Sequence, residues 1–460
     1  MDSMPRTSRR PSVPFLVALL FLALAASLAL FVPPATGQDN VLTGTSSGVA
    51  SIRIAVADFK PGASDPQTTA FKQTFDSTLY SDLASAGIFD IVSKSLMPPG
   101  SPGTPSEVQL QSYSSVPSSA AMVAFGSLGI TAGKLVVNGF LFDTKNLQYP
   151  QVLAKQYSED PTDDSARQVA HRFADEIIYR LGGGVPGIAE TKIYYVKIGG
   201  GVKEIWAMDY DGANQHAITH LGAISISPRI SPDNTRLAFV SFGKYGPQLK
   251  MYSLLLNRYI AFPSGNVSSE SPAWAPSGNE LAYAAAPNGS FEIWIADYNG
   301  NLARRITSFR GATSSPSYNP KTGAQIAFIS GRTGLPQLYI MDSDGSNVQQ
   351  MTDGGYVSSP SWSPNGQTIA FAWDRKYGPG APGGQDIYIM DVATKKWTQL
   401  THDGGRCDFP SWSPDGRHIV YSNSADGRSD HWRVWTMLAD GTQRRPLTDN
   451  GADMPNWSWK

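Results

Sequence analysis

The sequence predicts a mainly β protein, in which a small α/β domain is followed by a six-bladed β-propeller closed by its own C-terminal strand. Three observations lead to this fold class. A proline phrase occurs six times from Pro228 onward, at intervals of 44 to 50 residues, and five of its six copies have an aromatic residue two positions after the proline. Each repeat holds four short runs of alternating apolar and polar residues between turn residues, which is typical of a propeller blade. The chain also ends within this phrase, on MPNWSWK.

The composition excludes several functional classes. The 460 residues carry a formal net charge of −1, so nothing in the composition suggests a basic face for nucleic acid. Cys407 is the only cysteine, which rules out an intrachain disulfide and a thiolate metal cluster. We expect Cys407 to be a structural or surface residue and not a nucleophile.

The N-terminal residues have the pattern of a signal peptide. Arginines precede the apolar run Phe15–Val32, and the small residues of Ala35-Thr36-Gly37 follow it. We expect residues 1–37 to be cleaved off and residues 38–50 to form a flexible segment. The alternative is a retained anchor, because 18 apolar residues are just enough to span a bilayer.

Residues 51–186 alternate predicted strands and helices. The expected strands are Ile52–Phe59, Ile88–Val92, Lys134–Asp143 and Gln151–Glu159. The expected helices are Phe71–Gly87 and Ser165–Gly184, since both place apolar residues at four-residue steps and end on glycine. Met97–Ser119 is expected to be largely loop. These elements predict a small α/β domain, which Gly182–Thr191 connects to a propeller at 187–460.

The repeated phrase predicts the innermost strand of each blade. Its prolines are Pro228, Pro272, Pro316, Pro360, Pro410 and Pro455, and the residues two positions later are Ile230, Trp274, Tyr318, Trp362, Trp412 and Trp457. Prolines at strand ends cost little, because no ladder hydrogen bond is lost there. We expect each tryptophan to be buried between neighbouring blades, so the phrase has a structural role.

The two ends of the propeller region complement each other. The first unit, from Thr191 to about Thr219, contains three strands and lacks an inner one, whereas the final MPNWSWK is an inner strand with nothing after it. We therefore expect the C-terminal strand to complete the first blade and close the ring, which removes exposed sheet edges.

No catalytic or metal-binding constellation is evident. Gly44–Gly48 matches G-x-S-x-G, but it lies in a polar tail without the strand and helix that a nucleophile elbow requires. His216 and His220 would lie about 13 Å apart on a strand, too far to share a metal. Asp209-Tyr210-Asp211-Gly212 is expected to be a hairpin turn. We expect no cofactor, although a Ca²⁺ ion in the propeller channel stays an alternative.

Together these features resemble the TolB family, the periplasmic component of the Tol–Pal system of Gram-negative bacteria. The likeness is most specific in FDIVSKSLMP (Phe89–Pro98) and in Ala170–Val196. The resemblance implies a monomeric, non-enzymatic binding protein of the periplasm that associates with membranes only through its partners. Those partners would be a Pal-like lipoprotein and a TolA-like inner-membrane protein, in a role that supports outer-membrane integrity and cell division.

The resemblance also implies two binding regions. The loops leading into the inner strands would bind Pal through Ser268, Glu270, Ser271, Arg310, Thr313, Ser314, Tyr356, Ser358, Arg406 and Asp408. The mature N-terminal segment would bind TolA, beginning with Gln38, Asp39, Asn40, Val41 and Leu42. This segment does not closely match the usual family segment. The second blade is also atypical, because Arg229-Ile230 replaces the usual aromatic residue.

Two other readings are open at this stage. One is the propeller module of an exported peptidase, although the 51–186 domain is small for a hydrolase domain of about 200–250 residues. The other is a propeller that binds glycan or peptidoglycan through its channel.

Overall fold

The computed structural model describes residues 51–244, 246–263, 267–309, 311–375, 384–402, 405–428 and 430–459. The predicted signal peptide and the 38–50 segment lie outside these residues. Within the described part of the chain, no helix is long and apolar enough to cross a membrane.

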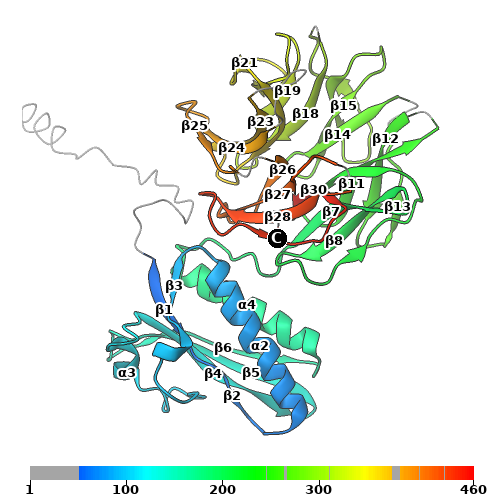
Figure 1. Ribbon diagram of the computed structural model, residues 1–460. Coiled ribbons are helices and arrows are strands. Elements are labelled where there is room, and N and C mark those ends of the chain that lie inside the picture. The colour runs from blue at the N-terminus through cyan, green and yellow to red at the C-terminus, as the bar shows by residue number, and fades with distance from the viewer. Residues whose placement is uncertain are drawn as a thin grey trace, which may run out of the picture. The chain divides into compact units, whose positions relative to one another are not determined.

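A six-stranded mixed sheet forms the centre of the N-terminal domain (Figure 1). Its strands are β1 (Ile52–Val56), β2 (Lys60–Pro61), β3 (Phe89–Ile91), β4 (Met122–Thr131), β5 (Lys134–Asp143) and β6 (Gln151–Glu159). They follow the order β3-β1-β4-β5-β6, with β2 beside β4. The pairs that involve β1 or β2 are parallel, whereas β4, β5 and β6 form an antiparallel meander.

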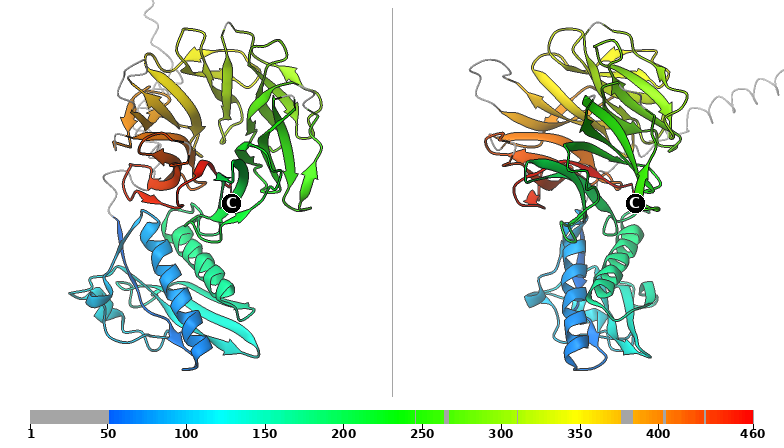
Figure 2. Two further views of the ribbon diagram at one scale, coloured as in Figure 1. Left: turned by 45° about the vertical axis from the view of Figure 1, so that its right-hand side comes forward. Right: turned by 90° about the vertical axis from the view of Figure 1, so that its right-hand side faces the viewer.

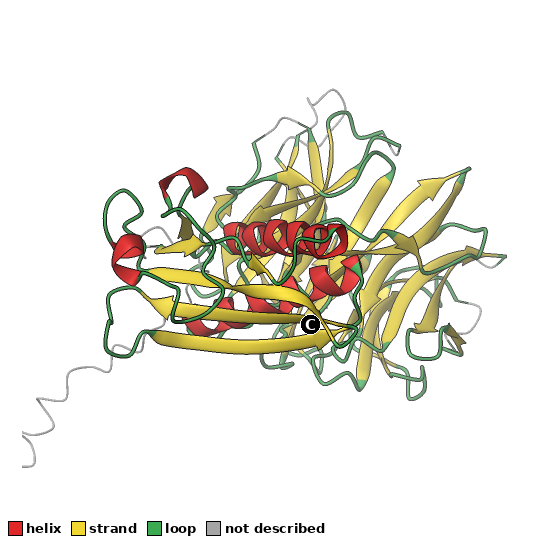
Figure 3. Cartoon of the chain, turned by 90° about the horizontal axis from the view of Figure 1, so that it is seen from below, coloured by secondary structure: helices red, strands yellow, loops and turns green. Residues whose placement is uncertain are grey.

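Two long helices lie over the same face of this sheet (Figure 3). They are α2 (Pro66–Ser85) and α4 (Asp163–Leu181). Asp65 caps α2 by accepting a hydrogen bond from the Thr68 amide at 2.9 Å, and Thr162 caps α4 in the same way. These caps satisfy backbone donors that the first helical turn leaves unpaired.

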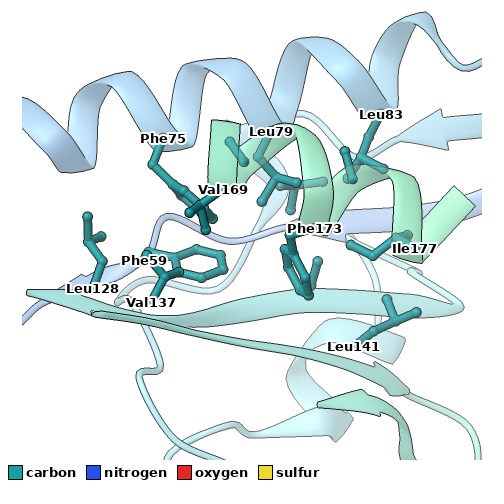
Figure 4. Close-up of a cluster of buried hydrophobic side chains, with 14 of the residues drawn as sticks. Phe59, Phe75, Leu79, Leu83, Leu128, Val137, Leu141, Val169, Phe173 and Ile177 are labelled. Carbon is teal, nitrogen blue, oxygen red and sulfur yellow. The ribbon is translucent and has the colours of Figure 1, made fainter. Parts of the chain in front are cut away.

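Apolar side chains of both helices fill the space above the sheet (Figure 4). The fully buried residues of this cluster include Phe75, Leu79, Leu83, Val169, Phe173 and Ile177 from the helices, together with Phe59, Val137 and Leu141 from outside them. The Phe59 ring centroid lies 4.5 Å from that of Phe75 and 6.0 Å from that of Phe173. Burying each such side chain contributes about 1.5–3 kcal/mol, so this cluster is the main source of the domain's stability.

The opposite face of the sheet is covered by the segment after β3. This segment contains the 3-10 turn η1 (Lys94–Leu96) and the short helix α3 (Leu110–Ser114). Tyr113 of α3 is buried in the same cluster as Phe125 and Phe142 of the sheet. The segment is therefore largely irregular, as predicted, but it closes a second apolar core.

The sequence prediction differs from the structure in several elements of this domain. It misses β4 entirely, although Val123 and Phe125 alternate with polar or small residues there. It also begins α2 five residues late, because Pro66 is tolerated at the first helical position, where no amide partner is lost. The strands β5 and β6 have the predicted bounds.

The rest of the described chain forms antiparallel units arranged around a common centre (Figure 2). Three of these units are four-stranded sheets. The first contains β10 (Ser225–Ile230), β11 (Arg236–Gly243), β12 (Gly246–Ser253) and β13 (Arg258–Ile260), and the second contains β14 (Ser269–Trp274), β15 (Glu280–Ala285), β16 (Glu292–Asp297) and β17 (Arg304–Arg305). The third contains β18 (Thr313–Tyr318), β19 (Gln325–Ser330), β20 (Gln337–Asp342) and β21 (Gln349–Gln350). This part of the chain is propeller-like and almost entirely β.

An eight-stranded sheet follows. It contains β22 (Tyr356–Trp362), β23 (Thr368–Asp374), β24 (Gln385–Asp391), β25 (Trp397–Gln399), β26 (Arg406–Trp412), β27 (His418–Ser424), β28 (Arg433–Leu438) and β29 (Arg445–Pro446). Its two halves are joined through a single residue pair, Gln385 and Arg406.

The last strand of the chain belongs to the sheet that begins the propeller region. β30 (Ala452–Trp457) pairs antiparallel with β7 (Lys192–Gly199), followed by β8 (Val202–Asp209) and β9 (His216–Ala217). Trp457 lies opposite Ile193 in this ladder, and its indole nitrogen donates to Thr191 Oγ1 at 2.8 Å. Residues more than 250 positions apart in the sequence therefore form one sheet.

The tryptophans of the repeated phrase pack between neighbouring units. Trp274 of β14 lies in a cluster with Val240 and Leu249 of the preceding sheet, and its indole nitrogen donates to the Arg229 carbonyl oxygen at 3.0 Å. Trp412 makes the corresponding hydrogen bond to the Ser361 carbonyl oxygen at 3.1 Å. These two indoles therefore fix the spacing between two units by burial and by a directional hydrogen bond, whereas the Trp362 indole nitrogen is buried without a hydrogen-bond partner among the described residues.

Candidate binding mouth of the propeller

Each inner strand (β10, β14, β18, β22, β26 and β30) changes direction at the residue before its proline. These residues are Ser227, Ser271, Ser315, Ser359, Phe409 and Met454, with φ between 50° and 54°. At the same point the ladder to the second strand shifts register. Such a bulge bends the strand and re-aims its side chains. It thus separates the beginning of each strand from its end, which carries the buried residue two positions after the proline.

We call the beginnings of these six strands the mouth. Of the ten loop residues predicted for partner binding, eight lie here, at the start of β14, β18, β22 and β26, and Ser268 comes directly before β14, whereas Arg310 lies outside the described residues. A small cavity of about 40 Å³ at this level is lined by the six residues with positive φ, by three of the prolines and by Arg229. The repeat thus brings side chains from distant parts of the sequence to one end of the inner strands.

Asp408 is the most extensively hydrogen-bonded of these residues. Its carboxylate accepts hydrogen bonds from Ser358 Oγ at 3.2 Å, from Gln385 Nε2 at 3.0 Å and from the Phe409 amide at 2.7 Å. Burial raises the pKa of Asp408, and these hydrogen bonds partly oppose that rise. Ser358 and Asp408 are therefore held together on neighbouring units, by a glutamine that the sequence analysis did not single out.

Three carboxyl groups occupy the same position in the repeat, two residues before the proline. They belong to Glu270, Asp408 and Asp453. Burial raises the pKa of each of the three, and Asp453 raises that of Asp408 further. Asp453 was missed by the sequence analysis, although its register in the repeat would have identified it. The mouth is thus rich in acceptor groups that a partner's donors could satisfy.

Two other predicted residues differ in their accessibility. Thr313 is fully buried, and its hydroxyl lies 3.3 Å from Ser330 Oγ, so its role is structural. Arg406 is exposed and is the positively charged member of the predicted set within the described chain.

A buried polar cluster joins the N-terminal domain to the first propeller unit. The Asp82 carboxylate of α2 accepts a hydrogen bond from the Tyr210 hydroxyl at 2.5 Å and lies 2.7 Å from His171 Nδ1 of α4. All three side chains are buried. Burial raises the pKa of both Asp82 and Tyr210.

Further contacts surround this cluster. Arg167 of α4 pairs with Asp211 at 2.7 Å, in the turn after β8. The Ser85 carbonyl oxygen lies 2.7 Å from His418 Nε2, and Arg417 donates to the Gly182 carbonyl oxygen at 3.3 Å. The unit that contacts the N-terminal domain through Tyr210 also carries Asp453 at the mouth, so one sheet connects the two regions.

The other sequence candidates do not form a site in the described part of the chain. His216 belongs to β9 and His220 lies beyond its end, and the described residues contain no group of three or more His, Cys, Asp or Glu side chains able to hold a metal. Cys407 is buried, and the Asn423 amide nitrogen lies 3.1 Å from its sulfur. Ser46 lies outside the described residues.

Comparison with known proteins identifies similar chains. Residues 179–460 match the family model of the TolB beta propeller domain, and residues 43–149 match that of the TolB amino-terminal domain. A protein TolB homolog of Chlorobium luteolum is 31% identical over 329 residues, which cover 71% of this chain and 72% of the relative. A Tol-Pal system protein TolB of Desulfosudis oleivorans is 33% identical over 182 residues, 40% of each chain.

The fold also matches a solved structure. The crystal structure of TolB from Acinetobacter baumannii superposes with a TM-score of 0.71 and 23% sequence identity, covering 89% of this chain and 97% of that one. Both domains therefore have a counterpart of the same fold.

Proposed function

Since this chain belongs to the TolB family, we propose that it is a periplasmic binding protein of the Tol–Pal system. In this role it joins a Pal-like lipoprotein of the outer membrane to a TolA-like protein of the inner membrane, and thereby supports envelope integrity and cell division. The observation that carries the proposal is the mouth, where the repeat gathers polar side chains of several units around one opening.

We count the propeller as six blades in a closed ring. The eight-stranded sheet contains two copies of the four-strand repeat, and a single pair, Gln385 and Arg406, connects them. The pairing of β30 with β7 supports closure, because it makes the first and last units neighbours. In a closed ring the six inner strands all present their beginnings at one mouth.

The Pal-like partner binds at this mouth through the predicted loop residues, to which Asp453 is added. Asp408 and Asp453 are prearranged by backbone hydrogen bonds from the residues that follow them, at 2.7 Å in both cases. Fixed carboxylates of this kind favour a partner surface that offers lysine, arginine or amide donors. Thr313 is excluded from direct contact because its side chain is fully buried with its hydroxyl against Ser330, whereas Asp453 keeps 6% of its surface exposed.

The test is the affinity of the mature chain for the Pal-like domain encoded in the same organism. Asp408→Asn together with Asp453→Asn should weaken binding by about tenfold or more, since charge-assisted hydrogen bonds are lost. Asp344→Asn together with Asp440→Asn is the matched control, because it removes the same two charges from exposed turns, one between β20 and β21 and one between β28 and β29. Equal affinities of the double variant and the control would reject the mouth as the Pal site.

The segment 38–50 is the proposed contact for the TolA-like partner, beginning with Gln38–Leu42. Binding of the Pal-like domain at the mouth changes how readily segment 38–50 can bind the TolA-like domain. Such coupling is reciprocal, so each partner changes the affinity of the chain for the other by the same factor. The affinity for the TolA-like domain should therefore change when the Pal-like domain is saturating. An unchanged affinity would discard the coupling, and an unchanged affinity after deletion of residues 38–50 would discard the contact itself.

The proposed role is binding without catalysis. Serine-directed fluorophosphonate probes should leave the mature chain unlabelled. Labelling of any serine would instead favour the alternative that the chain is the propeller module of an exported peptidase.

A further inference from the structure

The channel enclosed by the inner strands contains one charged side chain among its lining residues. The position after each proline faces this channel, and it is occupied in turn by Arg229, Ala273, Ser317, Ser361, Ser411 and Asn456. Together with the tryptophans and prolines of the phrase, these residues line a cavity of about 260 Å³. Arg229 thus replaces the small or amide side chain that the other five units place at this level.

Arg229 also borders the smaller cavity on the mouth side. The second cavity is lined by Ser227, Ser271, Ser315 and Ser359, whose backbones adopt positive φ. Because both cavities include Arg229, its side chain lies between the mouth and the tryptophan-lined part of the channel. A molecule in either cavity would therefore lie beside Arg229.

The charge of Arg229 has no acidic partner in the described structure. Its Nη1 donates to the Pro228 carbonyl oxygen at 2.8 Å, and no ion pair to Arg229 is found among the described residues. Burial alone lowers the pKa of Arg229 to about 10, so the side chain is still a cation at neutral pH. Placing a guanidinium in a confined channel without a counter-charge is unfavourable, and an anion in the channel would remove that penalty.

We propose that this channel is a binding site for a small organic carboxylate, held by the guanidinium of Arg229. The planar fork of arginine matches a carboxylate through two parallel hydrogen bonds. The surrounding indoles and prolines offer an apolar wall for the body of such a molecule, and the hydroxyls of Ser317 and Ser361 offer additional donors. The cavity volume limits the ligand to a small molecule, and this site is separate from the proposed partner contacts at the rim of the mouth.

The probe is benzoate, with benzamide as a neutral molecule of the same shape and inorganic phosphate as an anion without an apolar body. The thermal midpoint and the tryptophan fluorescence of the mature chain are measured against the concentration of each. Arg229→Ala introduces alanine, which the next unit has at the equivalent position as Ala273. Arg258→Ala is the matched control, because it removes an exposed arginine from β13. Wild type and Arg258→Ala should bind benzoate saturably, and Arg229→Ala and benzamide should each weaken binding by about tenfold or more.

Other results would overturn the proposal. These are equal benzoate binding by Arg229→Ala and the control, equal binding of benzamide and benzoate, or binding of phosphate in preference to benzoate. If Arg229→Ala does not fold, crystals of the unchanged chain soaked with 4-bromobenzoate decide the question. A bromine anomalous peak in the channel beside Arg229 supports the site, and a peak elsewhere or no peak refutes it.

Discussion

Tyr210 donates a hydrogen bond to Asp82 across the junction of the two domains, with 2.5 Å between the hydroxyl oxygen and Oδ1. Both side chains are almost completely buried, and the second carboxylate oxygen faces His171. A carboxylate in such surroundings is stable only while its donors are present. Removing the single hydroxyl group of Tyr210 should therefore lower the stability of the junction between the two domains.

Tyr210→Phe removes this hydroxyl and keeps the ring. We expect the free energy of unfolding to fall by about 1–3 kcal/mol, because a buried carboxylate oxygen loses its donor. Urea unfolding followed by circular dichroism measures the change. Tyr195→Phe is the control, since that hydroxyl donates to the exposed Gln215 side chain at 3.0 Å. A loss no larger than that of the control would contradict the assigned role.

Asp175 should make stability depend on pH. Its carboxylate accepts hydrogen bonds from the amides of Ala189 and Glu190, yet burial raises the pKa of Asp175 from 3.8 to about 7. The folded chain thus retains a proton that the unfolded chain releases, so this group's contribution to stability falls as the pH rises from about 4 to 7.

Asp175→Asn keeps an acceptor for the Ala189 amide but cannot ionise. Between pH 5 and pH 8 its free energy of unfolding should rise relative to that of the wild type by about 2 kcal/mol. Urea titrations at several pH values give this difference. Parallel stability curves for the two chains would show that Asp175 does not titrate in this window.

Gly187 lies against the same carboxylate. A Cβ atom at this position would be 1.9 Å from Asp175 Oδ1, which cannot be accommodated without displacing α4 or the connecting segment. Gly187→Ala should therefore destabilise the chain by about 1–3 kcal/mol. Gly199→Ala, where nothing lies within 4 Å of the added atom, should stay within about 0.5 kcal/mol of the wild type. Similar thermal midpoints for the two variants would contradict this.

Trp457 should be a large contributor to the sheet that joins β30 to β7. Trp457→Ala leaves a cavity between two units and should cost about 3–5 kcal/mol. Trp457→Phe retains most of the buried ring and loses mainly the hydrogen bond to Thr191, so its cost should be clearly smaller. Thermal unfolding of the two variants distinguishes these effects, and equal losses would show that packing at this position matters little.

Much of the fold could be predicted because its signals are local or repeated. The spacing of Phe75, Leu79 and Leu83 identifies α2, and the alternation in β5 and β6 gives their bounds. β4 was missed because glycines interrupt its alternation. Gly126 and Gly139 lie opposite each other between β4 and β5, and a Cβ at Gly126 would clash with the Asn138 carbonyl oxygen, a requirement visible only in three dimensions.

The candidate site was less predictable than the fold. The register of the repeat identifies which residues begin the inner strands, and so it locates Glu270 and Asp408. It does not reveal that Thr313 is buried or that Gln385 bridges Ser358 and Asp408, because these contacts depend on how neighbouring units pack. The junction residues Asp82, His171 and Tyr210 come from three separate elements, so no pattern in the sequence connects them.

The pairing of β30 with β7 also sets an order of events in time. During synthesis, β7 to β9 are made more than 200 residues before β30, so the edge of β7 that pairs with β30 stays open until the end of the chain is available. Contacts of such long sequence separation form late and slowly. Until β30 pairs, the open edge of β7 can pair with another chain, so the fraction of newly made chain that aggregates depends on how fast β30 reaches β7.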